Sequence, residues 1–169
     1  MKKFTKLLFL LISISVFSQS PWTQEKGKFY TQLSFTTIPN YNTLFGDPDY
    51  TISGKLTDNT VQFFGEYGLS DKTSLVINLP LKMISIDGFQ DPRIDCIGDC
   101  SRNFDKTALG NISLGLKHNF YKKDWVLSGQ LSLEANTSSY DMKSGIRTGY
   151  NAWSFTPLFL AGRGFGKTY

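Results

Sequence analysis

Two stretches of the chain carry residue types that could support chemistry. Ala161 to Thr168 (AGRGFGKT) follows a predicted strand and matches a relaxed phosphate-loop pattern. Such a loop needs backbone N–H groups around the phosphate, a lysine, a magnesium-binding threonine and a helix that starts there. Ala161 replaces the first glycine of the pattern, and the export predicted below would separate the chain from ATP. We interpret this stretch as a glycine-rich turn and predict no cofactor.

The second stretch, DGFQDPRIDCIGDC, has an aspartate at every fourth position. Carboxylates gathered on one loop can bind Ca²⁺ through their oxygens. The spacing is not that of an EF-hand, and Arg93, Arg102 and Lys106 could neutralise the cluster instead. A solvated loop is the simpler interpretation. The weaker alternative is a calcium site, whose candidate ligands are Asp87, Asp91, Asp95 and Asp99.

The N-terminus has the three parts of a secretory signal peptide. Lys2, Lys3 and Lys6 precede an apolar run, Leu7 to Phe17, that is too short to span a bilayer as a helix. Small residues then allow cleavage after Ser18 or after Ser20. We therefore predict a signal peptide over residues 1–20 and one partial β-barrel domain over residues 21–169.

Composition narrows the function classes further. Without the three signal-peptide lysines, the basic residues (18 in the full chain) nearly balance the 14 acidic ones, so nucleic acid is not predicted as a partner. A mean hydropathy of −0.20 is too polar for a helical membrane protein and fits strands that alternate apolar and polar residues.

The two cysteines, Cys96 and Cys100, have the spacing C-x₃-C. In the oxidising compartment of an exported protein, a local disulfide is the expected state. A metal site would need more ligands, and the single histidine, His118, lies in the apolar row of a predicted strand. No metal is predicted from this pair. No Ser/His/Asp set is visible either, and we predict that the chain is not an enzyme.

The clearest structural signal is a predicted β-hairpin from Leu109 to Asn136. Apolar and polar residues alternate along both arms, and Tyr121 to Asp124 forms the short turn. Each arm has about ten residues, enough for a tilted strand to cross a bilayer. His118 should lie near a membrane interface, close to the turn. The predicted lipid-facing row is Ile112, Leu114, Leu116, Phe120, Trp125, Leu127, Leu131 and Leu133.

The rest of the chain repeats this unit. Further strands are predicted at about Lys28–Ile38, Asn59–Leu69, Thr73–Ile86 and Asn151–Ala161. Pro39 and Asn40 should end the first strand, and Pro80 should weaken the third or mark a bulge. Tight turns are predicted at residues 68–72 and 162–166. Long loops are predicted at residues 40–58, 87–107 and 137–150, which gives the alternation of long and short connections found in outer-membrane barrels.

The residues opposite the apolar rows are polar or charged. In a barrel they would point into the lumen, where they could tune selectivity or form a salt-bridge network that fills a narrow barrel. Both interpretations stay open. The lumen-facing candidates are Gln62, Glu66, Asn78, Lys82, Lys117, Asn119, Gln130 and Glu134.

These patterns predict an all-β fold, an antiparallel up-and-down transmembrane β-barrel. The strands are longer than those of a typical soluble sandwich, and a closed barrel satisfies every backbone group in lipid. About six to seven strands are visible, whereas bacterial barrels need about eight to close. We expect an incomplete barrel: a fragment, a chain with undetected strands, or one of several chains that close a barrel together.

Three segments carry a family resemblance: Ala108 to Tyr121, Glu66 to Lys82 and Lys26 to Phe35. They resemble outer-membrane barrels of Gram-negative bacteria, in particular the transporters grouped with the phenol-degradation meta-pathway family. The resemblance implies a barrel fold and a passive channel or transporter role, without catalytic residues. Members of that family usually run longer and have more strands than this chain.

The leading functional hypothesis is an outer-membrane β-barrel that passes small solutes. The alternatives are a non-transporting structural or surface-interaction barrel and a soluble secreted β-sandwich or binding barrel. The predicted location is the cell outer membrane. The expected partners are outer-membrane lipid and the barrel-assembly machinery, and the substrate is not indicated by the sequence.

Overall fold

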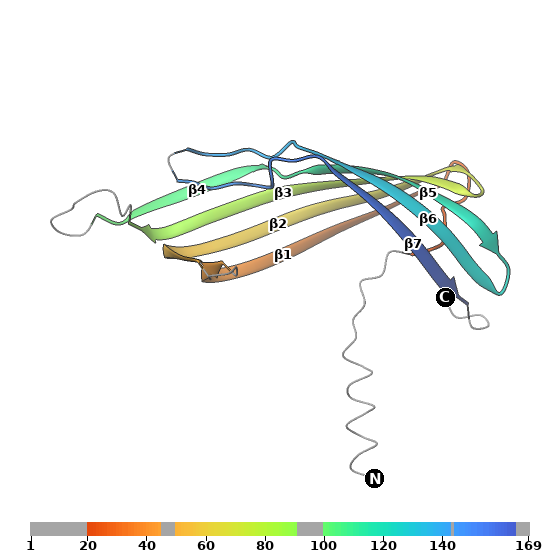
Figure 1. The fold of residues 1–169 in the computed structure, drawn as a ribbon, viewed down its shortest axis with the longest axis horizontal. Coiled ribbons are helices and arrows are strands. Elements are labelled where there is room, and N and C mark those ends of the chain that lie inside the picture. Colours follow the sequence, from red (N-terminus) through yellow and green to blue (C-terminus); the bar gives the residue numbers. More distant parts are fainter. Residues whose placement is uncertain (1–19, 45–49, 91–99, 143, 165–169) are drawn as a thin grey trace, which may run out of the picture.

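The computed structural model describes residues 20–44, 50–90, 100–142 and 144–164, and these residues form one curled antiparallel β-sheet (Figure 1). Within them no helix is present. The predicted all-β, antiparallel fold is therefore confirmed. The strands are β1 (Phe29–Leu44), β2 (Tyr50–Ser70), β3 (Thr73–Phe89), β4 (Arg102–Leu109), β5 (Ile112–Lys122), β6 (Trp125–Ala135) and β7 (Ser154–Arg163).

The strand order is β1-β2-β3-β5-β6-β7, so all sequence neighbours except β4 and β5 pair as in an up-and-down barrel. β4 and β5 share one edge of β3. β5 pairs with residues 73–78 of β3, and β4 pairs with residues 81–89. Figure 1 shows the sheet curling from β1 to β7 into a half-barrel. Among the described residues, β1 and β7 each pair with one neighbour only.

Pro80 lies where β4 and β5 meet on the edge of β3, but the predicted bulge is absent, because β3 continues through Pro80 with its register to β2 unbroken. Proline has no N–H to offer the neighbouring strand. Its carbonyl oxygen accepts a hydrogen bond of 2.8 Å from the N–H of Gly110, the residue that separates β4 from β5. A Cβ on Gly110 would lie 2.9 Å from the carbonyl oxygen of Thr148. Glycine is needed here because the backbone of another segment passes close by.

Two of the predicted long loops are wrong in extent, because strands cover most of residues 40–58 and both ends of residues 87–107. β1 continues through Pro39 and Asn40 to Leu44, with a register shift between Ile38 and Tyr41. Asn40 has a φ of 52°, which asparagine tolerates better than most residues, so a β-bulge replaces the expected strand end. The connection from β1 to β2 shortens to residues 45–49, and that from β3 to β4 shortens to residues 90–101.

The sequence pattern underestimates the length of these strands because the face that carries apolar residues changes along them. On β3, Leu75 to Met83 keep apolar side chains on one face of the sheet. Beyond Met83 that face becomes polar, where Ser85 pairs with Thr57 of β2. The alternation seen in the sequence changes its phase at this point, while the hydrogen-bonded ladder between β2 and β3 continues as far as Lys55 and Asp87.

Beyond Met83, the opposite face of the sheet carries a small apolar core. Ile84 and Ile86 of β3 are buried together with Ile146, which comes from the connection between β6 and β7. Partly buried Leu56, Phe89 and Phe104 pack against them, and the rings of Phe89 and Phe104 meet edge to face at 5.8 Å. This cluster holds the β6–β7 connection, residues 136–153, against the sheet.

Two of the three predicted short turns are confirmed. Asp71 and Lys72 join β2 to β3, and Lys123 and Asp124 join β5 to β6. The predicted last strand starts later than expected, at Ser154, and it includes Gly162 and Arg163 of the expected turn at residues 162–166. The end of that turn, residues 165 and 166, lies outside the described residues, as do residues 1–19 of the predicted signal peptide.

Candidate functional site

The sheet has two chemically different faces. The face that carries the lumen-facing candidates is called the polar face here, and the other is called the apolar face. The strand register places all eight candidates on the polar face, where they belong to β2, β3, β5 and β6. Several bond to one another: Gln62 Nε2, for example, donates to Asn78 Oδ1 at 2.8 Å. That this face lines a lumen stays a prediction.

An ion pair is buried on the polar face near the short turns. Lys117 Nζ lies 2.7 Å from Glu66 Oε2, and the two side chains are 3% and 5% exposed. Lys117 also donates to the carbonyl oxygen of Ser20 at 3.1 Å. The second carboxylate oxygen, Glu66 Oε1, is buried and has no hydrogen-bond partner among the residues that the structure describes. Glu66 therefore depends on Lys117 for its charge compensation.

The segment Ser20–Lys28, called the N-terminal strap here, lies across the polar face at this end of the sheet. The hydroxyl of Ser128 donates to the carbonyl oxygen of Pro21, and the N–H of Gln24 donates to Ser74 Oγ at 2.9 Å. The N–H of Gly27 donates to the carbonyl oxygen of Gly68 at 2.8 Å. The strap thus covers the polar side chains that lie between β3 and β6.

Gly68 allows the strap to lie this close. A Cβ at Gly68 would come within 2.0 Å of the carbonyl oxygen of Glu25, a backbone atom that cannot rotate away. We expect Gly68→Ala to displace the strap and to speed tryptic cleavage at Lys26 and Lys28 by about tenfold, which corresponds to roughly 1.4 kcal/mol of lost contact energy. The measurement is limited proteolysis of the folded protein followed by mass spectrometry.

Gly164→Ala is the matched control, because no described residue comes within 4 Å of a Cβ at that position. The control should be cleaved at the wild-type rate. Equal rates for Gly68→Ala and wild type would show that the strap does not pack on Gly68.

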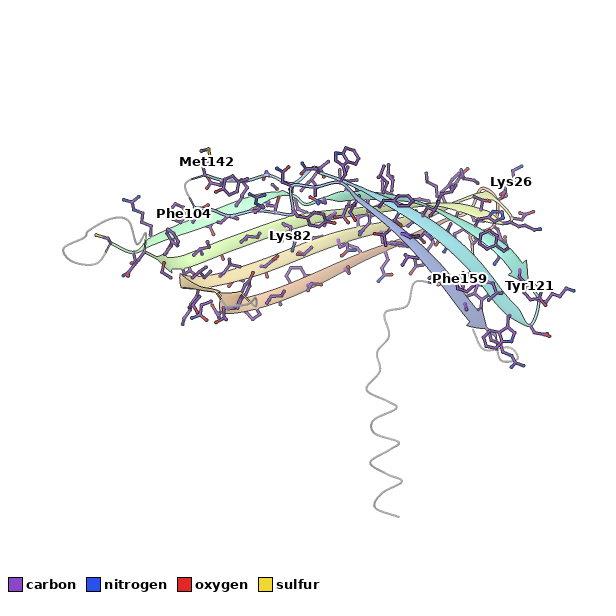
Figure 2. The ribbon with its side chains drawn as sticks, viewed as in Figure 1. Lys26, Lys82, Phe104, Tyr121, Met142 and Phe159 are labelled. Carbon is purple, nitrogen blue, oxygen red and sulfur yellow. The ribbon has the colours of Figure 1, made fainter. Side chains whose placement is uncertain are left out.

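The β6–β7 connection covers the polar face at the opposite end. The hydroxyl of Thr148 donates to the carbonyl oxygen of Leu109 at 2.8 Å, and Thr137 Oγ1 donates to that of Gly110 at 2.7 Å. Asn111 Nδ2 donates to the carbonyl oxygen of Tyr150 at 3.1 Å. Figure 2 shows the two ends, with Met142 and Phe104 near this connection and Lys26 and Tyr121 near the short turns.

A cleft of about 450 Å³ is hollowed into the polar face below this connection. Pockets of about 300–1,000 Å³ are typical of small-molecule sites. Lys82, labelled near the middle of the sheet in Figure 2, projects into this cleft and pairs with Asp58 at 2.7 Å. The cleft is lined by Thr36, Thr60, Gln62, Asn78, Pro80, Lys82, Gly110, Asn111, Ser113, Glu134, Thr148, Gly149 and Tyr150.

Two acceptor groups stand out in the cleft wall, the carboxylate of Glu134 and the amide oxygen of Asn111. The pKa of Tyr150 is raised, first because its hydroxyl hydrogen-bonds to the Glu134 carboxylate, so this tyrosine stays protonated at neutral pH. Asn111 is 6% exposed, and its Oδ1 is buried without a hydrogen-bond partner. A Cβ at Gly149 would lie 2.5 Å from that oxygen. Because Asn111 Oδ1 is covered, the Glu134 carboxylate is the group of these two that can accept hydrogen bonds and positive charge from the cleft.

The apolar face is exposed across the sheet. Leu33 on β1 and Phe159 on β7 are each 72% exposed, and Phe159 is labelled in Figure 2. His118, which belongs to this face, bonds through Nδ1 to Thr73 Oγ1 at 2.9 Å and meets the ring of Phe120 edge to face at 5.1 Å. It lies beside the Asp71–Lys72 turn, so its polar atoms are close to the end of the sheet.

The remaining predicted site residues are not brought together. Asp87 is exposed on β3 opposite Lys55, whereas the other three calcium candidates, Asp91, Asp95 and Asp99, lie outside the described residues. Among residues 20–44, 50–90, 100–142 and 144–164, no group of three His, Cys, Asp or Glu side chains could hold a metal ion.

The cysteine pair has one member in the described part of the chain. Cys100 is described and Cys96 is not, so their disulfide stays a prediction. We expect a thiol-reactive maleimide to leave the denatured mature protein unlabelled and to add two labels after reduction. Mass spectrometry gives the count directly. Two labels without reduction would contradict the disulfide.

Sequence reasoning missed Asp58, Asn111 and Tyr150, which all lie in or beside the cleft. Asp58 falls at the end of a predicted loop, although it continues the alternation of Thr60 and Gln62 along β2. That continued alternation could have placed Asp58 on the strand and on the polar face. Nothing in the sequence indicates that Asn111 and Tyr150 meet, because the contact joins residues far apart in the chain across a folded loop.

Comparisons with known proteins do not assign the chain to a family. No protein-family model matches the chain, and no curated protein is significantly similar to it. A search of the described residues finds no helix with the length and hydropathy needed to cross a membrane.

Proposed function

We propose that this protein is a β-barrel of the outer membrane whose polar face lines an aqueous lumen. The observation that carries the proposal is an inverted pattern of burial. Lys117, Glu66 and Gln130 are almost fully buried, while leucine and phenylalanine side chains are exposed over the whole opposite face. A large exposed apolar surface on a soluble monomer is unusual and is typical of contact with a membrane or another protein.

The height of the apolar face supports lipid as its neighbour. Leu75 to Met83 of β3 span roughly 26 Å along the strand at about 3.3 Å per residue, or about 20 Å of membrane thickness at a tilt of about 40°. Lipid-facing bands of outer-membrane barrels are about 25 Å tall. The change to Ser85 and Asp87 on the same face fits a membrane boundary just beyond Met83.

A barrel of this kind needs partners for both sheet edges. Unpaired N–H and C=O groups cannot face the hydrocarbon region, because no water is there to bind them. The free edges of β1 and β7 would therefore pair with further strands, either from the same polypeptide or from other chains. The half-barrel supplies one side of the wall.

For such a barrel, passage of small solutes is the function that the cleft supports best. The cleft is lined mainly by polar residues, has the size of a small-molecule site and lies on the side that would become the lumen. The resemblance to transporters of the phenol-degradation type points the same way. The test is single-channel conductance of the protein, extracted from outer membranes in detergent and inserted into planar bilayers. Stepwise current increases are expected.

A structural or surface-interaction barrel is the second candidate. The N-terminal strap and the buried Lys117–Glu66 pair fill part of the polar face, as a plugged barrel would require. Stable insertion into bilayers without any conductance would favour this second candidate over the channel.

A further inference from the structure

We infer that the cleft on the polar face selects cations over anions and that Glu134 is the residue that sets this preference. The inference rests on the proposed pore and adds the charge class of its solutes. It follows from how the charges on the polar face are compensated.

Two ion pairs neutralise the charges of four side chains on this face, and Lys106, opposite Ile84, does not line the cleft. Lys117 pairs with Glu66, and Lys82 pairs with Asp58, each at 2.7 Å. A pair at this distance acts on a passing ion mainly as a dipole, so its net charge contribution is small.

Glu134 carries the charge that remains in the cleft. The ionisable side chains that line the cleft are Lys82, Glu134 and Tyr150. Lys82 is compensated by Asp58, and Tyr150 is protonated because its pKa is raised beside Glu134. The Tyr150 hydroxyl satisfies the carboxylate as a neutral donor and leaves its negative charge in place.

Asn111 Oδ1, the other acceptor of the wall, is buried against Gly149 and is out of reach of a solute in the cleft. A solute that carries positive charge or N–H groups meets the Glu134 carboxylate, whereas an anion is repelled by it. Single carboxylates in a narrow polar passage focus the field and raise the local cation concentration.

The test is the reversal potential of the full-length protein in planar bilayers under a tenfold KCl gradient. The wild-type protein should give a reversal potential whose sign shows that K⁺ passes more readily than Cl⁻. Glu134→Gln keeps the hydrogen bond to Tyr150 and removes only the charge, so we expect the permeability ratio of K⁺ over Cl⁻ to fall at least threefold. Asp124→Asn removes a carboxylate from the β5–β6 turn, away from the cleft, and should leave the ratio unchanged.

Two further variants should move the ratio in opposite directions. Lys82→Gln frees the charge of Asp58 and should raise cation selectivity, whereas Asp58→Asn frees the charge of Lys82 and should lower it. An unchanged ratio in Glu134→Gln, or equal effects of Glu134→Gln and Asp124→Asn, would overturn the inference while the pore stands. Absence of conductance in wild type would instead reject the proposed pore, and the selectivity role with it.

Discussion

Replacing Lys117 with methionine should lower the free energy of unfolding by about 3–5 kcal/mol, because it leaves Glu66 buried without a partner. The two side chains are 3% and 5% exposed, so water cannot take the place of the lost ammonium group. Glu66 Oε1 already lacks a hydrogen bond, and the N-terminal strap loses the bond from Lys117 to Ser20 as well. The midpoint of urea unfolding, followed by tryptophan fluorescence, measures the loss.

The double variant Lys117→Met with Glu66→Leu is the matched control. It removes both charges and keeps apolar volume on both strands, so most of the lost stability should return. If the Lys117→Met variant unfolds at the same urea concentration as wild type, the Lys117–Glu66 pair is solvated and is not buried.

A charge placed in the middle of the apolar face gives the second large effect. Leu114 lies on this face of β5, between Ile77 of β3 and Leu133 of β6. If lipid covers the face, Leu114→Arg should destabilise the folded protein by about 2–4 kcal/mol, the cost of an arginine near the bilayer midplane. The unfolding midpoint in lipid vesicles and the amount of folded protein in outer membranes both report this change.

Ser85→Arg tests the same face beyond the proposed boundary. Ser85 lies on β3 above Met83, opposite Asp105 of β4, where water should replace lipid. Its replacement should change stability by less than about 0.5 kcal/mol, the usual size for surface positions. Equal effects at Leu114 and Ser85 would remove the boundary, and a neutral Leu114→Arg would place the whole face in water.

The hairpin between Leu109 and Asn136 shows how much of this fold can be predicted. Its two arms and its turn are found as β5, β6 and the Lys123–Asp124 connection. Period-2 alternation depends on local geometry alone, so the sequence reveals strands wherever one face is apolar throughout. For the same reason, the alternation alone assigns the residues of the polar face to one side of the sheet.

The ends of β2 and β3 that lie far from the Asp71–Lys72 turn show which part of the fold could not be predicted. On β3 the alternation of apolar and polar residues changes its phase between Met83 and Ile84. The sequence there looks like a loop, although the hydrogen-bonded ladder between the two strands continues. The long loop predicted at residues 137–150 is found between β6 and β7. Where this loop and the N-terminal strap lie against the sheet could not be predicted, for another reason. Their placement depends on contacts such as Gln24 to Ser74 and Thr148 to Leu109, which join distant parts of the chain and leave no periodic signal.

Fractionation of cells that express the full chain tests the central claim most directly, namely that lipid covers the apolar face. The protein should remain in the outer-membrane pellet after washing with alkaline carbonate and should enter solution only with detergent. Recovery as a folded protein in the detergent-free periplasmic fraction would contradict the membrane barrel and would favour a soluble secreted β-protein.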